Sequence, residues 1–447
     1  MSSSMDHVIE DQEGEQLKST QPRAIEKREG GGLFSPLRVR NFQLLFAGQT
    51  ISTLGDNFYA VALPWLVLTT GGNPQELGII LMGYGLPRLG AILLGGVLSD
   101  KIRPRWVMLI ADAVRAVLVA ILAVLGIMGH PAFWQLLAVA IPLGAFGGLF
   151  IPASFTMIPD ILDDADLQAG NSLNFSSTQL ATLVGSGIAG TVVSMAGSGI
   201  ALAIDAGSFI VSAVSLAAMR TKNVAIAVTA NAASTTGQAE TTGVSRGENA
   251  SEPVAGFWQI IRSSALVQVA LVIVVVANLT LGGMVEVALP ALARGPLNAG
   301  AAGFGFLLSC FGAGAFIGSI VTGLLGKLTH RGAISLLVAI AQAGAIALIP
   351  YAGGLIGALV CMFIMGFTNS ITNVLFITLI QQTLPRAQLG RMMSVIMFAA
   401  LGSYPISVLF TGILVTRTGP AIMFPISAAF LAVGALFGLS RREIREL

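Results

Sequence analysis

The chain contains a repeat whose two copies lie 226 positions apart. Residues 61–64, Val-Ala-Leu-Pro, return as residues 287–290, and the same separation aligns Lys101 with Lys327. Self-similarity over such a long period predicts two similar units in tandem, and it limits the topology before any local pattern is considered. We therefore expect a fold made of two related halves.

The composition indicates a membrane protein. Of the 447 residues, 54% are hydrophobic and only 10% are charged, whereas an ordinary soluble domain is about 25% charged. The net charge of +2 gives no basic face for nucleic acid, so nucleic acid is not expected as a partner. The lipid bilayer is the expected surrounding of most of this chain.

Twelve apolar stretches are long enough to cross a bilayer, because a helix needs about 20 apolar residues to span ~30 Å of hydrocarbon. The sequence thus predicts an all-α membrane protein with twelve transmembrane helices. The predicted spans are 41–67, 76–99, 105–128, 133–157, 168–194, 198–219, 264–291, 300–326, 332–350, 354–382, 391–416 and 419–440.

Lysine and arginine fix the expected orientation, since these residues accumulate in cytoplasmic segments. With the N-terminus inside, the cytoplasmic segments hold 20 of the 24 Lys and Arg residues, and the external loops hold only Arg294 and Arg417. We expect a multi-pass protein of the cell membrane with both termini in the cytoplasm.

The domain organisation follows from the spans and from one polar stretch between the sixth and seventh. That stretch is rich in Ala, Thr, Ser and Gly and lacks apolar periodicity, which is typical of a flexible linker. The leader is polar and lacks the apolar region of a signal peptide. The expected parts are a disordered tail 1–35, an N-terminal six-helix bundle 36–220, a linker 221–255, a C-terminal six-helix bundle 256–440 and a tail 441–447.

The loop between the second and third spans reads Gly96-Val-Leu-Ser-Asp100-Lys101-Ile-Arg103-Pro-Arg105. This loop resembles the cytoplasmic signature of the major facilitator superfamily. The segments 54–56, 112–115, 159–160 and 389–391 resemble the branch that includes macrolide-efflux proteins and siderophore exporters. The resemblance covers residues 36–440 and implies two pseudo-symmetric six-helix bundles with a substrate site between them. Ser186 stands where antiporters of the family typically carry a proline.

A cytoplasmic gate is expected around the signature loop. An aspartate at a helix end can cap the N-terminus of a facing helix, where the helix dipole favours an anion. The resemblance implies that Asp100 caps the start of the eleventh span in this way. Arg103 and Arg105 would pair with nearby aspartates, or they would only set the topology. The predicted gate residues are Gly96, Asp100, Lys101, Arg103, Arg105, Asp160 and Arg391.

Ionisable side chains inside predicted spans are costly and therefore indicate function or pairing. Asp56 and Arg88 fall at similar depths in the first two spans, so we expect them to pair and to take part in proton coupling or substrate contact, or to form a static pair. Glu286 is expected to attract a cationic substrate or accept a proton at the external mouth, or to be a surface carboxylate that snorkels to water. Asp112 and Arg115, three residues apart, are expected to form a structural pair.

Polar stripes on several spans predict the lining of a central cavity, although small polar residues also hold membrane helices together. The candidate cavity residues are Gln49, Asn57, Asn174, Thr178, Asn278, Asn369, Asn373 and Tyr404. The Gly144-xxx-Gly148 and Gly314-xxx-Gly318 pairs are interpreted as packing surfaces. No metal or cofactor is expected.

The sequence favours a secondary transporter over other membrane proteins. It contains no phosphate-binding P-loop, and no predicted span contains a nucleophile with a base, so neither a pump driven by ATP nor an enzyme is expected. The most favoured function is proton-coupled efflux of amphipathic small molecules (drugs, macrolides or siderophores) by alternating access. Such a multidrug-resistance antiporter is expected to be a monomer. An importer or facilitator of a small metabolite is the alternative, and a non-transporting sensor is a remote one.

Overall fold

The computed structural model describes residues 34–99, 102–219, 265–324, 331–383 and 386–440. All regular structure in these residues is helical. The predicted linker 221–255 and both predicted tails lie outside them, apart from two residues of the first tail. The elements are η1 (Ser35–Arg38), α2 (Arg40–Thr69), α3 (Pro74–Ser99), α4 (Pro104–Met128), α5 (Phe133–Ile161), α6 (Asp164–Ala218), α9 (Ala265–Gly283), η2 (Met284–Ala288), α10 (Leu289–Arg294), α11 (Gly300–Leu324), α12 (Arg331–Leu348), η3 (Ile349–Tyr351), α13 (Leu355–Thr383), α14 (Arg386–Thr418) and α15 (Met423–Ser440).

Within the described residues, eleven helices are long and apolar enough to cross a membrane. One of them, α6, has 55 residues, which is about 80 Å at ~1.5 Å per residue and too long for one crossing. Gly197 interrupts it with φ 85 and ψ 164, a backbone conformation that glycine adopts readily and other residues rarely do. The two parts of α6 correspond to the fifth and sixth predicted spans, so the helices agree with twelve crossings.

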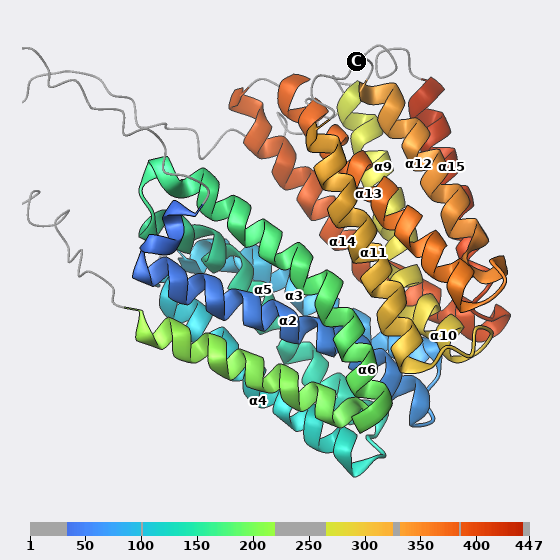
Figure 1. The fold of residues 1–447 in the computed structure, drawn as a ribbon, viewed down its shortest axis with the longest axis horizontal. Helices are drawn as coiled ribbons and strands as arrows, with labels where there is room; N and C mark the ends of the chain where they lie inside the picture. The colour runs from blue at the N-terminus through green and yellow to red at the C-terminus, as the bar shows by residue number, and fades with distance from the viewer. Residues whose placement is uncertain (1–33, 100–101, 220–264, 325–330, 384–385, 441–447) are drawn as a thin grey trace, which may run out of the picture.

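The helices form two groups whose internal packing repeats (Figure 1). In the first half α3 packs on α5 and α4 on α6, and in the second half α11 packs on α13 and α12 on α15. Across the halves α6 packs on α11, and α3 packs on α14. These two cross-contacts are equivalent under the repeat, so the structure has the pseudo-symmetric two-bundle architecture predicted from the sequence.

The small-residue pairs are packing surfaces, as predicted. A side chain at Gly144 or Gly148 would collide with the backbone of α3, and one at Gly314 or Gly318 would collide with the backbone of α13. Glycine at these four positions therefore lets two helix backbones approach closely, which membrane helices use in place of a hydrophobic driving force.

The two halves meet at the end of the molecule opposite the start of α2, and they diverge toward the end where α2 begins (Figure 1). A Cβ atom at Gly190 would lie 2.7 Å from the carbonyl oxygen of Ala301, and one at Gly412 would lie 2.6 Å from that of Pro74. The largest cluster of buried apolar side chains also combines both halves, including Leu63 of α2 and Leu292 of α10. We refer to this end as the closed end.

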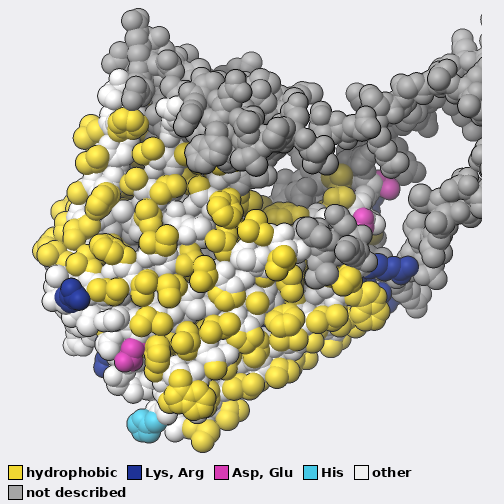
Figure 2. Space-filling view, turned by 180° about the vertical axis from the view of Figure 1, so that it is seen from behind, with side chains coloured by type: hydrophobic (Ala, Val, Ile, Leu, Met, Phe, Trp, Pro, Cys, Tyr) yellow, Lys and Arg dark blue, Asp and Glu magenta, His cyan; other side chains and the backbone are white. Residues whose placement is uncertain are grey.

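The outer surface is largely apolar. Figure 2 shows hydrophobic side chains over most of the described part of one face, with few charged ones. Large aliphatic side chains such as Leu94, Val214 and Val433 are exposed. A soluble protein rarely exposes so much contiguous apolar surface, so this surface is suited to lipid.

Candidate functional site

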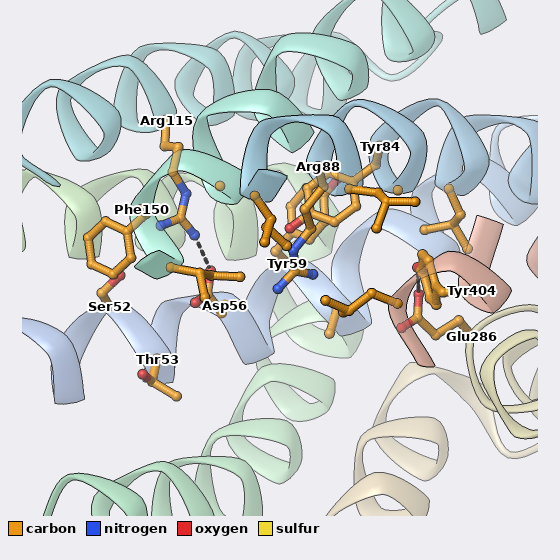
Figure 3. Close-up of a pocket in the computed structure, with 18 of the residues that line it drawn as sticks. Ser52, Thr53, Asp56, Tyr59, Tyr84, Arg88, Arg115, Phe150, Glu286 and Tyr404 are labelled. Carbon is orange, nitrogen blue, oxygen red and sulfur yellow. Dashed lines mark hydrogen bonds and ion pairs between the residues drawn. The ribbon is translucent and has the colours of Figure 1, made fainter. Parts of the chain in front are cut away.

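A cavity of about 560 Å³ lies between the two halves, and its walls come from both of them (Figure 3). The first half contributes residues of α2, α3, α4, α5 and α6, and the second half contributes residues of α9, η2 and α14. The lining includes Gln49, Ser52, Thr53, Asp56, Tyr59, Leu63, Tyr84, Arg88, Arg115, Phe150, Asn174, Thr178, Asn278, Glu286 and Tyr404.

One face of α2 forms a wall of this cavity. Gln49, Thr53, Asp56, Tyr59 and Leu63 recur at intervals of three or four residues and all line it, as expected for one stripe of an α-helix. Gln49 was predicted to line the cavity and Asp56 to take part in coupling or substrate contact, and Tyr59 extends their stripe by one turn. The helix thus presents a carboxylate and a phenol to the same space.

Arg115 of α4 connects two aspartates on different helices. Its Nη2 atom lies 2.8 Å from Oδ1 of Asp56 on α2, and its Nη1 atom lies 3.3 Å from Oδ1 of Asp112. The hydroxyl of Ser212 on α6 donates a hydrogen bond of 2.6 Å to the other oxygen of Asp112. The side chain of Asp112 is fully buried, whereas 49% of the Asp56 side chain is exposed. The network therefore runs from the packed interior of the bundle to the cavity.

Aromatic rings hold the guanidinium of Arg115 in place. Its central carbon lies 3.9 Å from the ring centre of Phe209 and 5.6 Å from that of Phe150. Cations are attracted to aromatic faces at such distances, more strongly where water is excluded. The arginine is thus fixed by its ring contacts as well as by its two carboxylates.

The expected pairing of Asp56 with Arg88 is wrong, because the partner of Asp56 is Arg115. The local contact between Asp112 and Arg115 is present, but it is one part of a network that also reaches Asp56. The spacing of three residues on one helix indicated only the local pair. Nothing in the sequence indicates that the same guanidinium also contacts a residue 59 positions earlier.

Arg88 of α3 lies in the cavity without a carboxylate at ion-pair distance among the described residues. Its guanidinium lies 5.5 Å from the ring centre of Tyr84, and its Nε atom is buried without a hydrogen-bond partner. Figure 3 shows the side chain between Asp56 on one side and Glu286 on the other. The hydroxyl of Tyr59 is likewise buried without a partner.

Glu286 reaches the cavity from an irregular turn of its helix. It belongs to the π-helical turn η2, in which the N–H of Leu289 donates to the carbonyl of Met284. Pro290 follows and has no N–H to offer the carbonyl of Glu286, so the regular helical bond is absent there. Such π turns are frequent at functional sites. The carboxylate accepts a short hydrogen bond from the hydroxyl of Tyr404 on α14.

The remaining predicted cavity residues divide into two groups. Gln49, Asn174, Thr178, Asn278 and Tyr404 line the cavity. Asn57, Asn369 and Asn373 are not among its lining residues, and for these three the expected placement is wrong. Asn57 is buried and accepts a hydrogen bond from Ser186, while the amide of Asn373 donates to Asn369 on the exposed side of α13.

Part of the predicted gate can be located. Arg105 donates hydrogen bonds of 2.8 and 2.7 Å to the carbonyls of Leu216 and Ala217 at the end of α6, where a cation is favoured by the helix dipole. No ion pair joins Arg103 or Arg105 to Asp160 among the described residues. Asp100 and Lys101 lie outside the described part of the chain, and so do the side chain of Arg391 and the surroundings of Gly96.

Metal ligation has no support in the described residues, where no group of three His, Cys, Asp or Glu side chains converges. The cavity instead combines charged, aromatic and aliphatic side chains from two symmetric halves, which is the arrangement of transporters with a site between repeats. The family model described as Major Facilitator Superfamily matches residues 45–404.

The chain belongs to the major facilitator superfamily. Members of this superfamily carry small molecules across membranes, and the long apolar helices of this chain indicate a multi-pass membrane protein. The family match and the transporter neighbours point away from an enzyme.

Curated relatives include transporters named for efflux. The multidrug efflux pump Tap of Mycolicibacterium fortuitum is 34% identical over 185 residues, which are 40% of this chain and 44% of that pump. The chain thus spans less than half the length of that relative in the match. The enterobactin exporter EntS of Shigella boydii is 23% identical over 356 residues, covering 78% of this chain and 79% of the exporter.

Solved structures share the fold. The crystal structure of a peptide transporter POT in complex with sulfate superimposes with a TM-score of 0.67 over 91% of this chain and 96% of that one, at 15% identity. A bacterial metal transporter superimposes with a TM-score of 0.63 at 14% identity, over 90% of this chain and 98% of that one. These similarities concern the architecture alone.

Proposed function

We propose that this protein is a proton-coupled exporter of amphipathic small molecules such as drugs, macrolides or siderophores. The single observation that carries the proposal is the cavity-facing carboxylate of Asp56, which is paired with the largely buried Arg115. This carboxylate meets water on one side and a cation on the other. It can therefore exist in two states, either protonated and neutral or ionised and paired with the cation. The transporter would work as an antiporter.

The coupling step follows from the two acids that share Arg115. When Asp56 takes up a proton it loses its charge, and Arg115 keeps Asp112 as its remaining anionic partner. The contact between α2 and α4 then weakens at the cavity wall. When the proton leaves, the ion pair forms again. Protonation thereby alters the helix that contributes more polar lining residues than any other.

The lining suits amphipathic cargo. Tyr59, Tyr84, Phe150 and Tyr404 offer aromatic surface, while Asp56, Arg88 and Glu286 offer charge. The volume of the cavity lies within the range of about 300–1,000 Å³ that is typical of sites for drug-sized ligands, and polar side chains such as Gln49, Asn174 and Asn278 lie among the apolar ones. The names of the relatives Tap and EntS, a multidrug efflux pump and an enterobactin exporter, support export as the direction.

The distribution of Lys and Arg supports a cell-membrane protein with both termini in the cytoplasm. In that orientation the closed end faces outward and the halves diverge toward the cytoplasm, so substrate would load from inside. Alternating access would then require the contacts between α6 and α11 and between α3 and α14 to open. We propose a monomer, because each chain holds both halves of the site.

An importer or facilitator of a small metabolite is the second candidate, since the same cavity would serve influx. A sensor that does not transport is the remote one. A screen for resistance and accumulation in a pump-deficient host, with macrolides, dyes and siderophores as probes, separates the three. Cells lacking the exporter accumulate more probe, cells lacking an importer accumulate less, and a sensor leaves accumulation unchanged.

The mechanism is tested in inside-out vesicles with an imposed pH gradient and the probe that the screen selects. Asp56→Asn should abolish gradient-driven accumulation, whereas Glu76→Gln, an acid at the start of α3 that lies outside the cavity, should leave it intact. Normal accumulation and normal proton movement in Asp56→Asn would show that the coupling residue is elsewhere.

A further inference from the structure

Two hydrogen-bond donors in the cavity wall lack an acceptor, and both belong to side chains that pack near the ring of Tyr84. The Nε atom of Arg88 and the hydroxyl of Tyr59 are buried without partners among the described residues. The guanidinium carbon of Arg88 is 5.5 Å from the ring centre of Tyr84, and the ring of Tyr59 is 6.2 Å from it. Buried polar groups in native proteins are nearly always paired, so an unpaired set calls for an explanation.

We propose that Arg88 and Tyr59 bind the carboxylate of an amphipathic aromatic acid whose ring system packs against Tyr84. The proposal rests on the transport function proposed above and specifies the chemical class of its substrate. A guanidinium has donors only and stays charged in proteins, so its complement is an anion. Arg88 and Tyr59 both line the cavity, and a guanidinium and a phenol can each donate to a carboxylate oxygen.

The acids near Arg88 do not fill this role. Asp56 is held by Arg115, and Glu286 accepts the hydrogen bond from Tyr404. Figure 3 shows both acids flanking Arg88, and neither reaches it at ion-pair distance in the structure. The two carboxylates make the electrostatic potential of the cavity less positive. Selection of an anion therefore depends on the directed donors of Arg88 and Tyr59 and not on overall charge. A cationic ligand would leave both donors unpaired and would face the charge of Arg88.

The surroundings of the two donors specify the rest of the ligand. The rings of Tyr59 and Tyr84 are tilted by 38° to each other, and Leu81, Leu89 and Ile92 add aliphatic surface to the same wall. Flat aromatic bodies pack well against such rings. Peptide-like or sugar-like anions would place polar groups against the aliphatic side chains of this wall, where burial without a hydrogen bond is costly. An aromatic body bearing one carboxylate matches both parts of the wall.

The proposal is tested by binding to purified full-length protein in phosphatidylcholine nanodiscs, measured by calorimetry without a pH gradient. The probes are 2-naphthoate, the neutral 2-naphthalenemethanol and the cationic (2-naphthylmethyl)trimethylammonium. Wild type should bind naphthoate about tenfold more tightly than the alcohol, as one charge-assisted hydrogen bond allows. Arg88→Gln should remove this preference, Tyr59→Phe should reduce it about threefold, and Arg88→Lys should retain part of it.

Controls separate loss of the site from loss of the fold. Arg417→Gln removes an exposed arginine at the end of α14 and should bind all three probes like wild type. Unchanged binding of the alcohol by Arg88→Gln shows that its cavity is intact. The proposal would be overturned if wild type bound acid and alcohol with equal affinity. It would also be overturned if Arg88→Gln kept the full preference for naphthoate, or if the cation bound more tightly than the acid.

A phosphate oxygen of an anionic lipid presents the same chemistry as a carboxylate, and a second nanodisc composition distinguishes the two. If phosphatidylglycerol displaces naphthoate in wild type, the site belongs to lipid and the proposal fails. Unchanged naphthoate affinity supports it. Binding is measured without a pH gradient. A failure of proton-coupled export in the vesicle assay therefore does not change the conclusion from the naphthoate affinities. Coupled export with no acid preference in the binding assay rejects only the substrate class.

Discussion

Arg115 holds Asp56 at 2.8 Å and Asp112 at 3.3 Å, so a single guanidinium joins an acid that meets the cavity to one that is sealed inside the bundle. The exposed fractions of the two side chains, 49% and 0%, decide their roles. Only Asp56 can exchange a proton with cavity water directly. In the proposed coupling step, Asp112 would keep the arginine in position while Asp56 takes up and releases a proton.

Removal of the arginine should destabilise the protein. Arg115→Leu leaves the buried Asp112 without its cationic partner, and breaking a buried pair in this way typically costs about 3–5 kcal/mol. The midpoint of thermal unfolding in detergent should fall accordingly. The double variant Arg115→Leu with Asp112→Asn should regain much of the loss, because no unpaired buried charge remains. Equal midpoints for the single and double variants would contradict the assigned pairing.

Ser212 should contribute through its hydrogen bond to Asp112. Ser212→Ala removes the donor 2.6 Å from the buried carboxylate, and an unsatisfied buried group costs about 1–3 kcal/mol. Ser194→Ala is the matched control, since that exposed serine bonds only to its own helix backbone in the described contacts. Thermal unfolding of both variants measures the difference. A Ser212→Ala protein as stable as the control would remove this residue from the network.

The bond between Tyr404 and Glu286 should stabilise the observed arrangement of α14 and η2. Tyr404→Phe removes a hydrogen bond to a carboxylate, worth about 1.5–3 kcal/mol, while keeping the ring. The unfolding midpoint should decrease, and it should not change in Tyr351→Phe, where the side chain is exposed. If the two variants unfold alike, the bond between Tyr404 and Glu286 contributes nothing measurable.

Gly190 should control closure between the halves. A Cβ there would lie 2.7 Å from the carbonyl oxygen of Ala301, so Gly190→Val should force α6 from α11 at the closed end. Spin labels on residues 69 and 294, in a background lacking native cysteines, should report a longer distance. Gly207→Val is the control, because open space surrounds that position. An unchanged distance in Gly190→Val would mean that the two helices do not seal this end.

The architecture was predictable because hydrophobic length and the repeat specify spans and symmetry without any knowledge of side-chain contacts. The positions around each helix were harder to predict. Asp56 and Asn57 are neighbours in sequence but lie about 100° apart around the helix, so one faces the cavity and the other contacts Ser186 on α6. Arg88 was expected to pair with Asp56 because the two residues lie at similar depths in the bilayer. Depth gives no information about the direction in which a side chain points around its helix.

Tyr59 and Tyr84 were missed for a different reason. Tyr59 continues the polar stripe of α2 by one turn, so extending the stripe past Asp56 would have found it. Tyr84 could not be found in this way, because its ring matters through its contacts with Arg88 and Tyr59. The offset of 226 aligns Asp56 with Gly282 and Arg88 with Gly314. The charges of Asp56 and Arg88 therefore have no counterpart at the aligned positions of the second half.

The most direct test of the account counts protons per transported molecule in proteoliposomes containing the full-length protein and the probe selected by the accumulation screen. Because the proposed exchange is antiport, probe that leaves the lumen should acidify it and probe that enters should alkalinise it. The change in pH should be proportional to the amount of probe moved. Asp56→Asn should retain binding of the probe and its passive exchange across the membrane but move no protons. A proton-to-probe ratio in Asp56→Asn equal to that of wild type would contradict the central claim.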